Sequence, residues 1–397
     1  MGKQKKLKCL FIYDNKLKTK DSNFYTSGGI NDKLFKRYVT SFENIVVITR
    51  MEKVDYYENL SQITSSNIIF APVRGLAFSK VFSIYFIPNV QLFIREFKEA
   101  DFVVLRLPSF LGIFALIVNV VYKKKYFLEV AGDAKEALLT SKINPSIPFK
   151  VFTQVFFKLN KYFIKSADGV IYVTQNALQK KYPTDGLSEY ASNVEINIRN
   201  RELNLSDYKC SNEYFKVGLI GDYNNHYKGI SEAVHSIKML SDLNYDINLH
   251  IVGSGTLLEY YQSLSKSLGL EGSIHFEGRL RDNTEVINWL ETLDLYIQPS
   301  YTEGLPRALI EAMSVGLPAV STNVGGIPEL LDIDDLVPSY NAVELANRMK
   351  DFLDSIELRY KKGKLNYSKS KLYDRDKLAK RRSSFWSSCR DLVKNNM

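Results

Sequence analysis

The stretch QPSYTEGLPRALIEAMSVGLPAVSTNVGGIPEL, residues 298–330, has the clearest local pattern in this chain of 397 residues. The apolar run over residues 295–298 predicts a buried strand, and a polar loop follows it. Pro306 then opens a helix, because proline tolerates the first helical position, where an N–H group would have no intrahelical partner. Gly316 closes that helix. The stretch therefore predicts a strand, a loop and a helix.

A second unit of the same kind comes next. A strand over residues 319–321 leads through Gly325 and Gly326 to a helix that we expect to begin at Pro328. Helix N-termini at the carboxyl ends of parallel strands favour a phosphate-bearing ligand, because their N–H groups are unpaired and the helix dipole is positive there. Glu303 precedes the first helix and Glu311 lies inside it. Since a carboxylate accepts hydrogen bonds from both hydroxyls of a diol, Glu311 suits a ribose and Glu303 a sugar.

These residues carry a resemblance to a known family. The two glutamates, embedded in P-S-x-x-E-G-x-P, E-A-M-x-x-G-x-P and G-G-I-P-E-L, resemble the E-x7-E signature of the retaining family-4 glycosyltransferases, which belong to glycosyl transferases group 1. The resemblance, to the type that builds bacterial surface polysaccharides, implies the GT-B architecture. It places Glu303 beside the donor sugar and Glu311 on the nucleotide ribose. It also implies donor contacts from the amides of Gly304 and Leu305, with Leu309 as a further candidate.

The resemblance implies more donor-binding positions in the second half of the chain, at Gly221, Lys228, Arg279 and Leu280. Lys228 and the glycine after it match the lysine that binds the donor diphosphate in the family. Asp222 stands where the family commonly has an arginine. The diphosphate would then be neutralised by Lys228, by the helix N-termini and by Arg279 or Arg307, while the backbone at 279 and 280 meets the nucleobase.

Domain organisation follows from length and from alternating patterns. The chain is long enough for two domains of about 200 residues. Strand and helix patterns alternate from residue 7 onward, which predicts α/β doubly wound (Rossmann-like) sheets. We expect an acceptor-binding domain over residues 1–200, a nucleotide-sugar donor-binding domain over residues 201–375, and a C-terminal helix over residues 376–397 that packs back on the first domain. The two domains should face each other.

The first half of the chain offers fewer candidates. Gly28 and Gly29 follow the first strand and occupy the place of a glycine pair that approaches the donor in the family. Many members carry a histidine close to the transferred sugar, but all four histidines of this chain lie in its second half. We therefore predict Asp133 as a catalytic or acceptor-binding residue, the alternative being a helix N-cap. Glu129 and Arg106, which also lies at a strand end, are further candidates.

Charge is unevenly distributed along the chain. Residues 1–200 contain 29 Lys and Arg against 17 Asp and Glu, although the net charge of the whole chain is only +9. Two aromatic segments, residues 76–100 and 147–165, carry lysines and arginines, which suits either an anionic membrane surface or an ordinary core with a solvated rim. We predict a cytoplasmic protein, peripheral on the inner face of the cell membrane, without a membrane span or nucleic-acid partner.

The predicted function is retaining transfer of a sugar from a nucleotide-diphosphate sugar to a glycan acceptor. That acceptor would be lipid-linked and used in cell-surface polysaccharide biosynthesis. No metal and no cofactor is expected, since neither D-x-D sequence, at 332–334 and 374–376, follows a metal-binding pattern, and the three cysteines are far apart. Two alternatives remain open, namely a GT-B nucleotide-sugar epimerase and a non-catalytic partner subunit.

Overall fold

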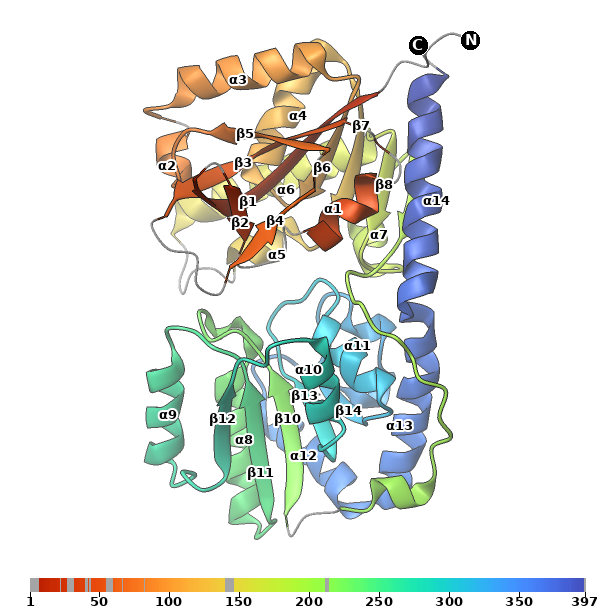
Figure 1. Cartoon of the computed structure of the whole chain (residues 1–397). Coiled ribbons are helices and arrows are strands. Elements are labelled where there is room, and N and C mark those ends of the chain that lie inside the picture. The colour runs from red at the N-terminus through yellow and green to blue at the C-terminus, as the bar shows by residue number, and fades with distance from the viewer. Residues whose placement is uncertain are drawn as a thin grey trace.

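Two α/β domains stack end to end in the protein, with one long helix along their side (Figure 1). The computed structural model describes residues 7–21, 23–26, 32–39, 42, 44–54, 60–65, 67–81, 83–139, 146–210 and 214–395. Gly28 and Gly29 lie outside these described residues. The prediction of two facing doubly wound domains is confirmed.

The first domain is built on a mostly parallel sheet. Its strands run in the spatial order β5-β3-β1-β6-β7-β8-β9, and β2 and β4 add a small antiparallel extension at the end of β1. The strands are β1 (Lys8–Lys20), β2 (Asn23–Thr26), β3 (Asn44–Lys53), β4 (Ser61–Ile63), β5 (Ile68–Val73), β6 (Phe102–Leu107), β7 (Lys125–Val130), β8 (Gly169–Tyr172) and β9 (Leu187–Tyr190). The helices are α1 (Asp32–Val39), α2 (Phe78–Val81), α3 (Phe86–Glu99), α4 (Phe110–Tyr122), α5 (Ala134–Leu139), α6 (Ile147–Lys165) and α7 (Ala177–Lys181).

The second domain repeats this winding with six parallel strands in the order β12-β11-β10-β13-β14-β15. The strands are β10 (Phe215–Ile220), β11 (Ile247–Val252), β12 (Ile274–Gly278), β13 (Leu295–Gln298), β14 (Ala319–Thr322) and β15 (Leu336–Val337). The helices are α8 (Ile230–Asp242), α9 (Leu258–Ser267), α10 (Asn283–Leu290), α11 (Arg307–Ser314), α12 (Ala342–Asp354) and α13 (Ile356–Ser370). In both sheets the chain reverses its winding direction beside the first strand, and ligands bind at such switch points.

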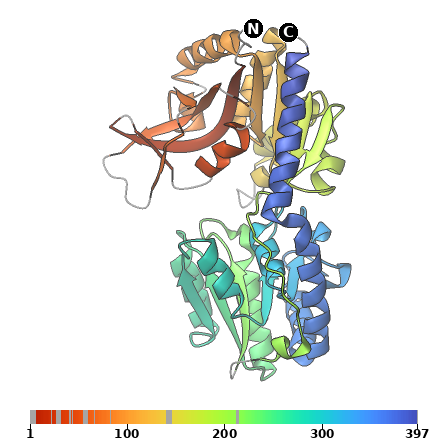
Figure 2. The same cartoon turned by 45° about the vertical axis from the view of Figure 1, so that its right-hand side comes forward.

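The helix α14 (Arg375–Lys394) ties the domains together, running upward beside the first domain (Figure 2). Its Trp386 is buried against Tyr38 of α1, with ring centroids 5.1 Å apart. The other connection between the two sheets runs through residues 191–210, and Ile196 in it pairs with Asp374 just before α14. The chain therefore crosses between the domains twice, and the two crossings touch.

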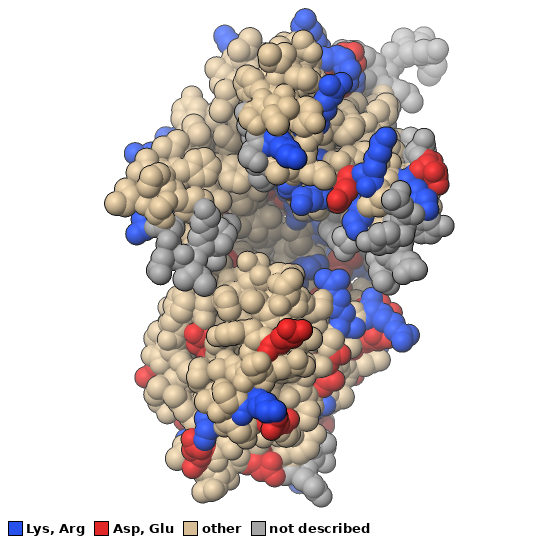
Figure 3. Space-filling model, turned by 90° about the vertical axis from the view of Figure 1, so that its left-hand side faces the viewer, with Lys and Arg blue, Asp and Glu red and all other residues tan. Residues whose placement is uncertain are grey.

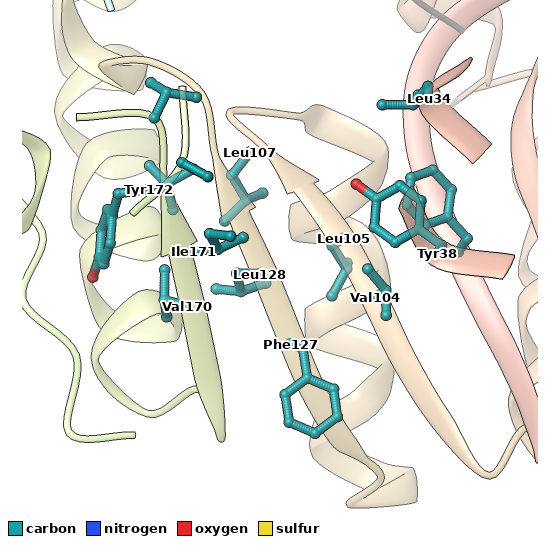
Figure 4. Close-up of a cluster of buried hydrophobic side chains, with 14 of the residues drawn as sticks. Leu34, Tyr38, Val104, Leu105, Leu107, Phe127, Leu128, Val170, Ile171 and Tyr172 are labelled. Carbon is teal, nitrogen blue, oxygen red and sulfur yellow. The ribbon is translucent and has the colours of Figure 1, made fainter. Parts of the chain in front are cut away.

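Parallel strands covered by helices on both faces read as continuous apolar runs, and β6 illustrates this with FVVLRL. Val104 and Leu105 of β6 lie beside Phe127 and Leu128 of β7, and Tyr38 of α1 points toward the same sheet (Figure 4). This packing fixes the strand ends from which the site is built.

The helix predicted at Pro328 is wrong. Residues Ile327–Glu329 form a 3-10 helix of three residues. A single tight turn aligns too few peptide dipoles to act as a helix N-terminus, so α11 is the helix whose start faces the cavity from this stretch.

Candidate active site

The two switch points face each other across a cavity of about 750 Å³. The hollow between the domains is visible in the space-filling view (Figure 3). Residues of both domains line it: Tyr13, Leu34, Arg37, Arg106, Ala131 and Val173 from the first, Asn193, Glu195 and Asn197 from the connection, and Asn283, Thr284, Glu303, Gly304, Leu305, Arg307, Glu311 and Arg375 from the second domain and the start of α14. A cavity of this volume is of ligand-binding size.

Glu303 and Lys228 form an ion pair at the second switch point. The Lys228 ammonium donates to Glu303 Oε1 at 2.6 Å, and both side chains are largely buried. Although burial disfavours the charged ammonium, the carboxylate of Glu303 outweighs it and raises the pKa of Lys228. The structure thus brings together two residues that sequence analysis predicted separately.

Polar side chains of the buried strand β13 and of the loop after it hold Glu303 in place. Its Oε1 also accepts hydrogen bonds from Ser300 Oγ at 2.7 Å and from Gln298 Nε2 at 3.1 Å. Tyr296 in turn donates to Gln298 Oε1 at 2.8 Å. Sequence analysis missed these supporting residues, although polar side chains inside an apolar run are the signal that could have found them.

Glycines allow the loops around this pair to approach closely. Gly229 has a φ of +66°, and a Cβ atom there would lie 1.9 Å from the carbonyl oxygen of Pro299. Gly304 meets the first domain, since a Cβ atom would lie 2.5 Å from the Ala131 carbonyl oxygen. The Gly304 carbonyl accepts a hydrogen bond from the N–H of Gly326 at 2.8 Å. The loops at Gly229 and Gly304 are therefore positioned by direct backbone contact, with no side chain between the segments.

Glu311 lies on α11 and lines the cavity. Burial raises the pKa of its carboxyl group, and the charge of Arg307 opposes that shift only in part. Among the described residues it has no hydrogen-bonding or ionic partner for its side chain. A desolvated carboxylate facing a cavity is suited to a ligand that brings its own hydroxyl donors. Leu309, by contrast, is fully buried in the core and does not line the cavity.

Basic and aromatic side chains form the wall contributed by the first domain. Arg106 pairs with Glu129 at 3.2 Å and lies over the ring of Tyr13, 5.0 Å from its centroid. Burial disfavours the charge on Glu129, but Arg106 and Arg37 outweigh it and lower the pKa of Glu129. Arg37 of α1 pairs with Glu195 at 3.2 Å. Sequence analysis identified Arg106 and Glu129 but missed Arg37, which no local pattern marks.

Asp133 is turned away from the cavity. Its Oδ1 accepts hydrogen bonds from the N–H groups of Lys135 and Glu136 at the start of α5, at 2.8 and 3.2 Å, as an N-cap does. The same oxygen accepts a hydrogen bond from the Tyr182 hydroxyl at 2.9 Å, and Lys181 pairs with the other. The N-cap alternative thus describes the position of Asp133.

The remaining predicted residues follow strands of the second domain and do not line the cavity. Gly221 directly follows β10, and its N–H donates to the Val252 carbonyl. Arg279 and Leu280 follow β12, and neither is among the described residues that line the cavity. No group of three or more His, Cys, Asp or Glu side chains in the described part of the chain could hold a metal ion. Within the same residues, no helix has the length and apolarity needed to cross a membrane.

One further contact spans the domains next to the cavity. The Glu329 carboxylate accepts hydrogen bonds from the backbone N–H groups of Gln175 at 2.6 Å and Asn176 at 2.8 Å, and also from that of Ala177. Residues 175–177 open the short helix α7 of the first domain. Glu329, from the G-G-I-P-E-L sequence, therefore links the two domains by charge-assisted hydrogen bonds.

Comparison with known proteins gives three kinds of similarity. Residues 207–368 match the family described as glycosyl transferases group 1. Protein CapJ of Staphylococcus aureus is 29% identical over 387 residues, which cover 91% of this chain and 96% of CapJ. WcaL of Escherichia coli K12, named as a colanic acid biosynthesis glycosyltransferase, is 35% identical over 142 residues, or 33% of this chain and 35% of WcaL.

Two solved structures share the fold over nearly the whole chain. Sucrose-phosphate synthase from Thermosynechococcus elongatus has a TM-score of 0.71 at 15% identity, covering 98% of this chain and 100% of that one. HepE of Anabaena, solved in complex with UDP and glucose, has a TM-score of 0.65 at 16% identity and covers 96% of this chain and 100% of its own. At these identities the likeness concerns the fold.

Proposed function

Because this chain is a glycosyltransferase of group 1, we propose that it transfers a sugar, with retention of anomeric configuration, from a nucleotide-diphosphate donor in the second domain to a glycan on the first. The observation that carries this proposal is the buried pair of Lys228 and Glu303 beside the partnerless carboxylate of Glu311. Together they offer a cation for a diphosphate and acceptors for sugar and ribose hydroxyls.

The chemistry balances without an added reagent. An acceptor hydroxyl oxygen bonds to the donor C1, the bond between C1 and the β-phosphate oxygen breaks, and the hydroxyl proton passes to a departing phosphate oxygen. Lys228 stabilises the negative charge that develops on the diphosphate, and the N-terminus of α11 adds to it. Glu303 is held on Oε1 by three donors, which suits positioning of the sugar better than nucleophilic attack.

No metal ion is needed in this proposal, because the protein itself supplies the positive charge. Arg307 at the start of α11 lines the cavity and is a second cation for the diphosphate. The nucleotide-binding step should therefore persist in the presence of EDTA. HepE, whose solved complex contains UDP, makes uridine nucleotides the first donors to test.

The proposed acceptor is a lipid-linked glycan of surface polysaccharide assembly. The name of WcaL, for colanic acid biosynthesis, supports the polysaccharide. Peripheral association with an anionic membrane would bring such an acceptor to Arg37 and Arg106, which line the first-domain wall. An epimerase would need free acid and base groups on that wall, but Glu129 and Glu195 are both in ion pairs.

The test is calorimetric titration with a panel of nucleoside diphosphates and their sugars, on the native protein and on Glu311→Ala. Selective binding that the substitution weakens supports the donor site and names the base. Transfer is then measured as nucleotide release that depends on a glycan acceptor, with the anomeric configuration of the product read by NMR. Absence of nucleotide binding in the native protein would overturn the proposal, and an inverted product would overturn retention.

A further inference from the structure

Large apolar side chains are exposed along one side of the first domain. They come from three neighbouring segments: the turn before α3 and its first residues, the face of α4, and the first half of α6. The exposed members are Ile84, Phe86, Ile87, Ile117, Val120, Val121, Ile147, Val151, Phe152 and Val155, and Val121 and Ile147 are each 78% exposed. We call this set the apolar face. A patch of this kind on a monomer usually marks an interaction surface.

Ring contacts join the three segments into one surface. Phe86 of α3 packs against Phe114 of α4, with centroids 6.2 Å apart. Phe110 of α4 packs against Phe152 of α6 at 5.8 Å. Because these rings bridge the helices, the exposed side chains beside them form one continuous face instead of three isolated spots.

Basic residues predominate in these segments, and the acidic residues of α3, Glu96 and Glu99, lie at its far end. Residues 76–95, 110–125 and 146–165 contain no Asp or Glu and nine Lys or Arg. Two of the nine are in ion pairs: Lys125 with Asp168, just before β8, at 3.1 Å, and Arg95 with Glu96 of α3 at 2.8 Å. Four belong to α6 alone, which has no acidic residue in its 19 residues. Figure 3, which shows the α2 and α3 side of the molecule, has more blue than red on the upper domain.

An apolar face with a basic surround fits an anionic lipid surface. Amphipathic helices bury apolar side chains among the headgroups while their lysines remain with the phosphates. Each Lys or Arg near such a surface contributes favourably, and salt screens that contribution. A second copy of this chain is a poorer occupant, because a symmetric interface would oppose two faces of the same positive sign.

The position of the face relates it to the cavity. The helix α4 starts after β6, whose Arg106 lines the cavity, and Ser109 caps α4 by accepting the Gly112 N–H at 2.8 Å. The helix α5 starts three residues after Ala131, another lining residue, and packs beside α6. The start of α4 is therefore anchored at the acceptor wall, and α5 connects that wall to α6.

We infer that the apolar face formed by α3, α4 and α6 docks on an anionic bilayer and thereby sets the acceptor wall next to the lipid headgroups. For the acceptor this rests on the proposed function, but docking itself is measured without the reaction. In the docked state a lipid-linked glycan reaches the cavity while its lipid stays in the membrane.

The experiment is sedimentation of the full chain with phosphatidylcholine vesicles that contain or lack phosphatidylglycerol, at low and high salt. The native protein should pellet with the anionic vesicles and be released by salt. Ile147→Asp combined with Val151→Asp and Val155→Asp should abolish pelleting. The matched control carries Leu243→Asp, Ile333→Asp and Val343→Asp, three exposed apolar positions of the second domain. This control should pellet like the native protein.

Lysines are tested with a matched pair of triple variants. Lys150→Gln, Lys158→Gln and Lys161→Gln should weaken partitioning into anionic vesicles about a hundredfold at low salt. Lys361→Gln, Lys364→Gln and Lys380→Gln, on the other domain and on α14, should leave it unchanged. In a Phe152→Trp variant, the added tryptophan's fluorescence emission should shift to the blue and be quenched by brominated lipid, whereas that of an Ile333→Trp variant should do neither.

Nucleotide binding, measured on every variant, separates this inference from the proposed function. Intact nucleotide binding without vesicle binding by the native protein would overturn the docking face and leave the donor site standing. An equal loss of vesicle binding in the apolar-face variants and in their controls would also overturn the inference of a docking face. If the apolar-face variants instead convert a dimer to a monomer and bind vesicles like the native protein, the apolar face is a protein interface.

Discussion

The ammonium of Lys228 lies 2.6 Å from the carboxylate of Glu303, although the two residues are 75 positions apart in the chain. The pair is a buried cation next to a buried anion, and Glu303 lines the cavity in which we propose that the donor binds. Removing either partner leaves the other charge uncompensated.

Lys228→Gln should lower kcat/KM about ten- to a hundredfold, since a hydrogen bond to a charged group contributes about 1.5–3 kcal/mol. It should also lower the free energy of unfolding, because Glu303 keeps its buried charge. The double variant Lys228→Gln, Glu303→Gln should recover stability in urea denaturation without recovering activity. Lys266→Gln, on the exposed surface of α9, is the control. Full activity in Lys228→Gln would remove the lysine from the mechanism.

Glu311→Gln should weaken nucleotide binding and yet stabilise the ligand-free protein. Burial raises the pKa of Glu311 in the folded state. A carboxyl group of this kind contributes its full stability below its unfolded pKa, and the contribution is lost as pH rises through the raised folded pKa. The variant should therefore have the higher Tm at neutral pH, and the difference should shrink as pH falls. Differential scanning calorimetry between pH 4 and 8 measures this difference in Tm. A lower Tm for the variant at neutral pH would contradict the prediction.

Gly229→Ala should destabilise the second domain more than Gly269→Ala. Both glycines have positive φ values, +66° and +71°, but a Cβ atom at 229 would meet the Pro299 carbonyl whereas one at 269 would meet nothing within 4 Å. Left-handed backbone alone costs an alanine about 1–2 kcal/mol. The steric contact should add about 1–3 kcal/mol. Equal urea-unfolding midpoints for the two variants would show that the loop adjusts to the added methyl group without loss of stability.

Glu329→Ala should release the start of α7. The backbone N–H groups of residues 175–177 donate to this carboxylate across the domain boundary. Hydrogen exchange at these amides should become about ten- to a hundredfold faster, because charge-assisted hydrogen bonds are lost. Amides of β13, in the core of the second domain, should exchange as before. Glu259→Ala on α9 is the control, and unchanged exchange at 175–177 would argue against the link.

The sequence by itself determined the local units around the donor site. Apolar runs, Pro306 and Gly316 were enough to predict β13, its loop and α11, because these features act through the chain's own hydrogen bonds and periodicity. Glu303 and Glu311, the two glutamates of the motif, both line the cavity. At Pro328 the same reasoning failed, since a proline start alone does not supply the helical residues that must follow it.

Only the tertiary structure decided which distant residues share the cavity. Arg37 of α1, Arg106 of β6 and Glu195 of the connection meet there because two sheets wind around their first strands and α14 fixes the domains to each other. Glu329 and Gln175 are 154 positions apart, and no sequence pattern in either segment predicts that they are in contact. Local patterns follow from short-range hydrogen bonding and periodic burial, whereas the wall of a cavity between domains follows from how whole sheets pack.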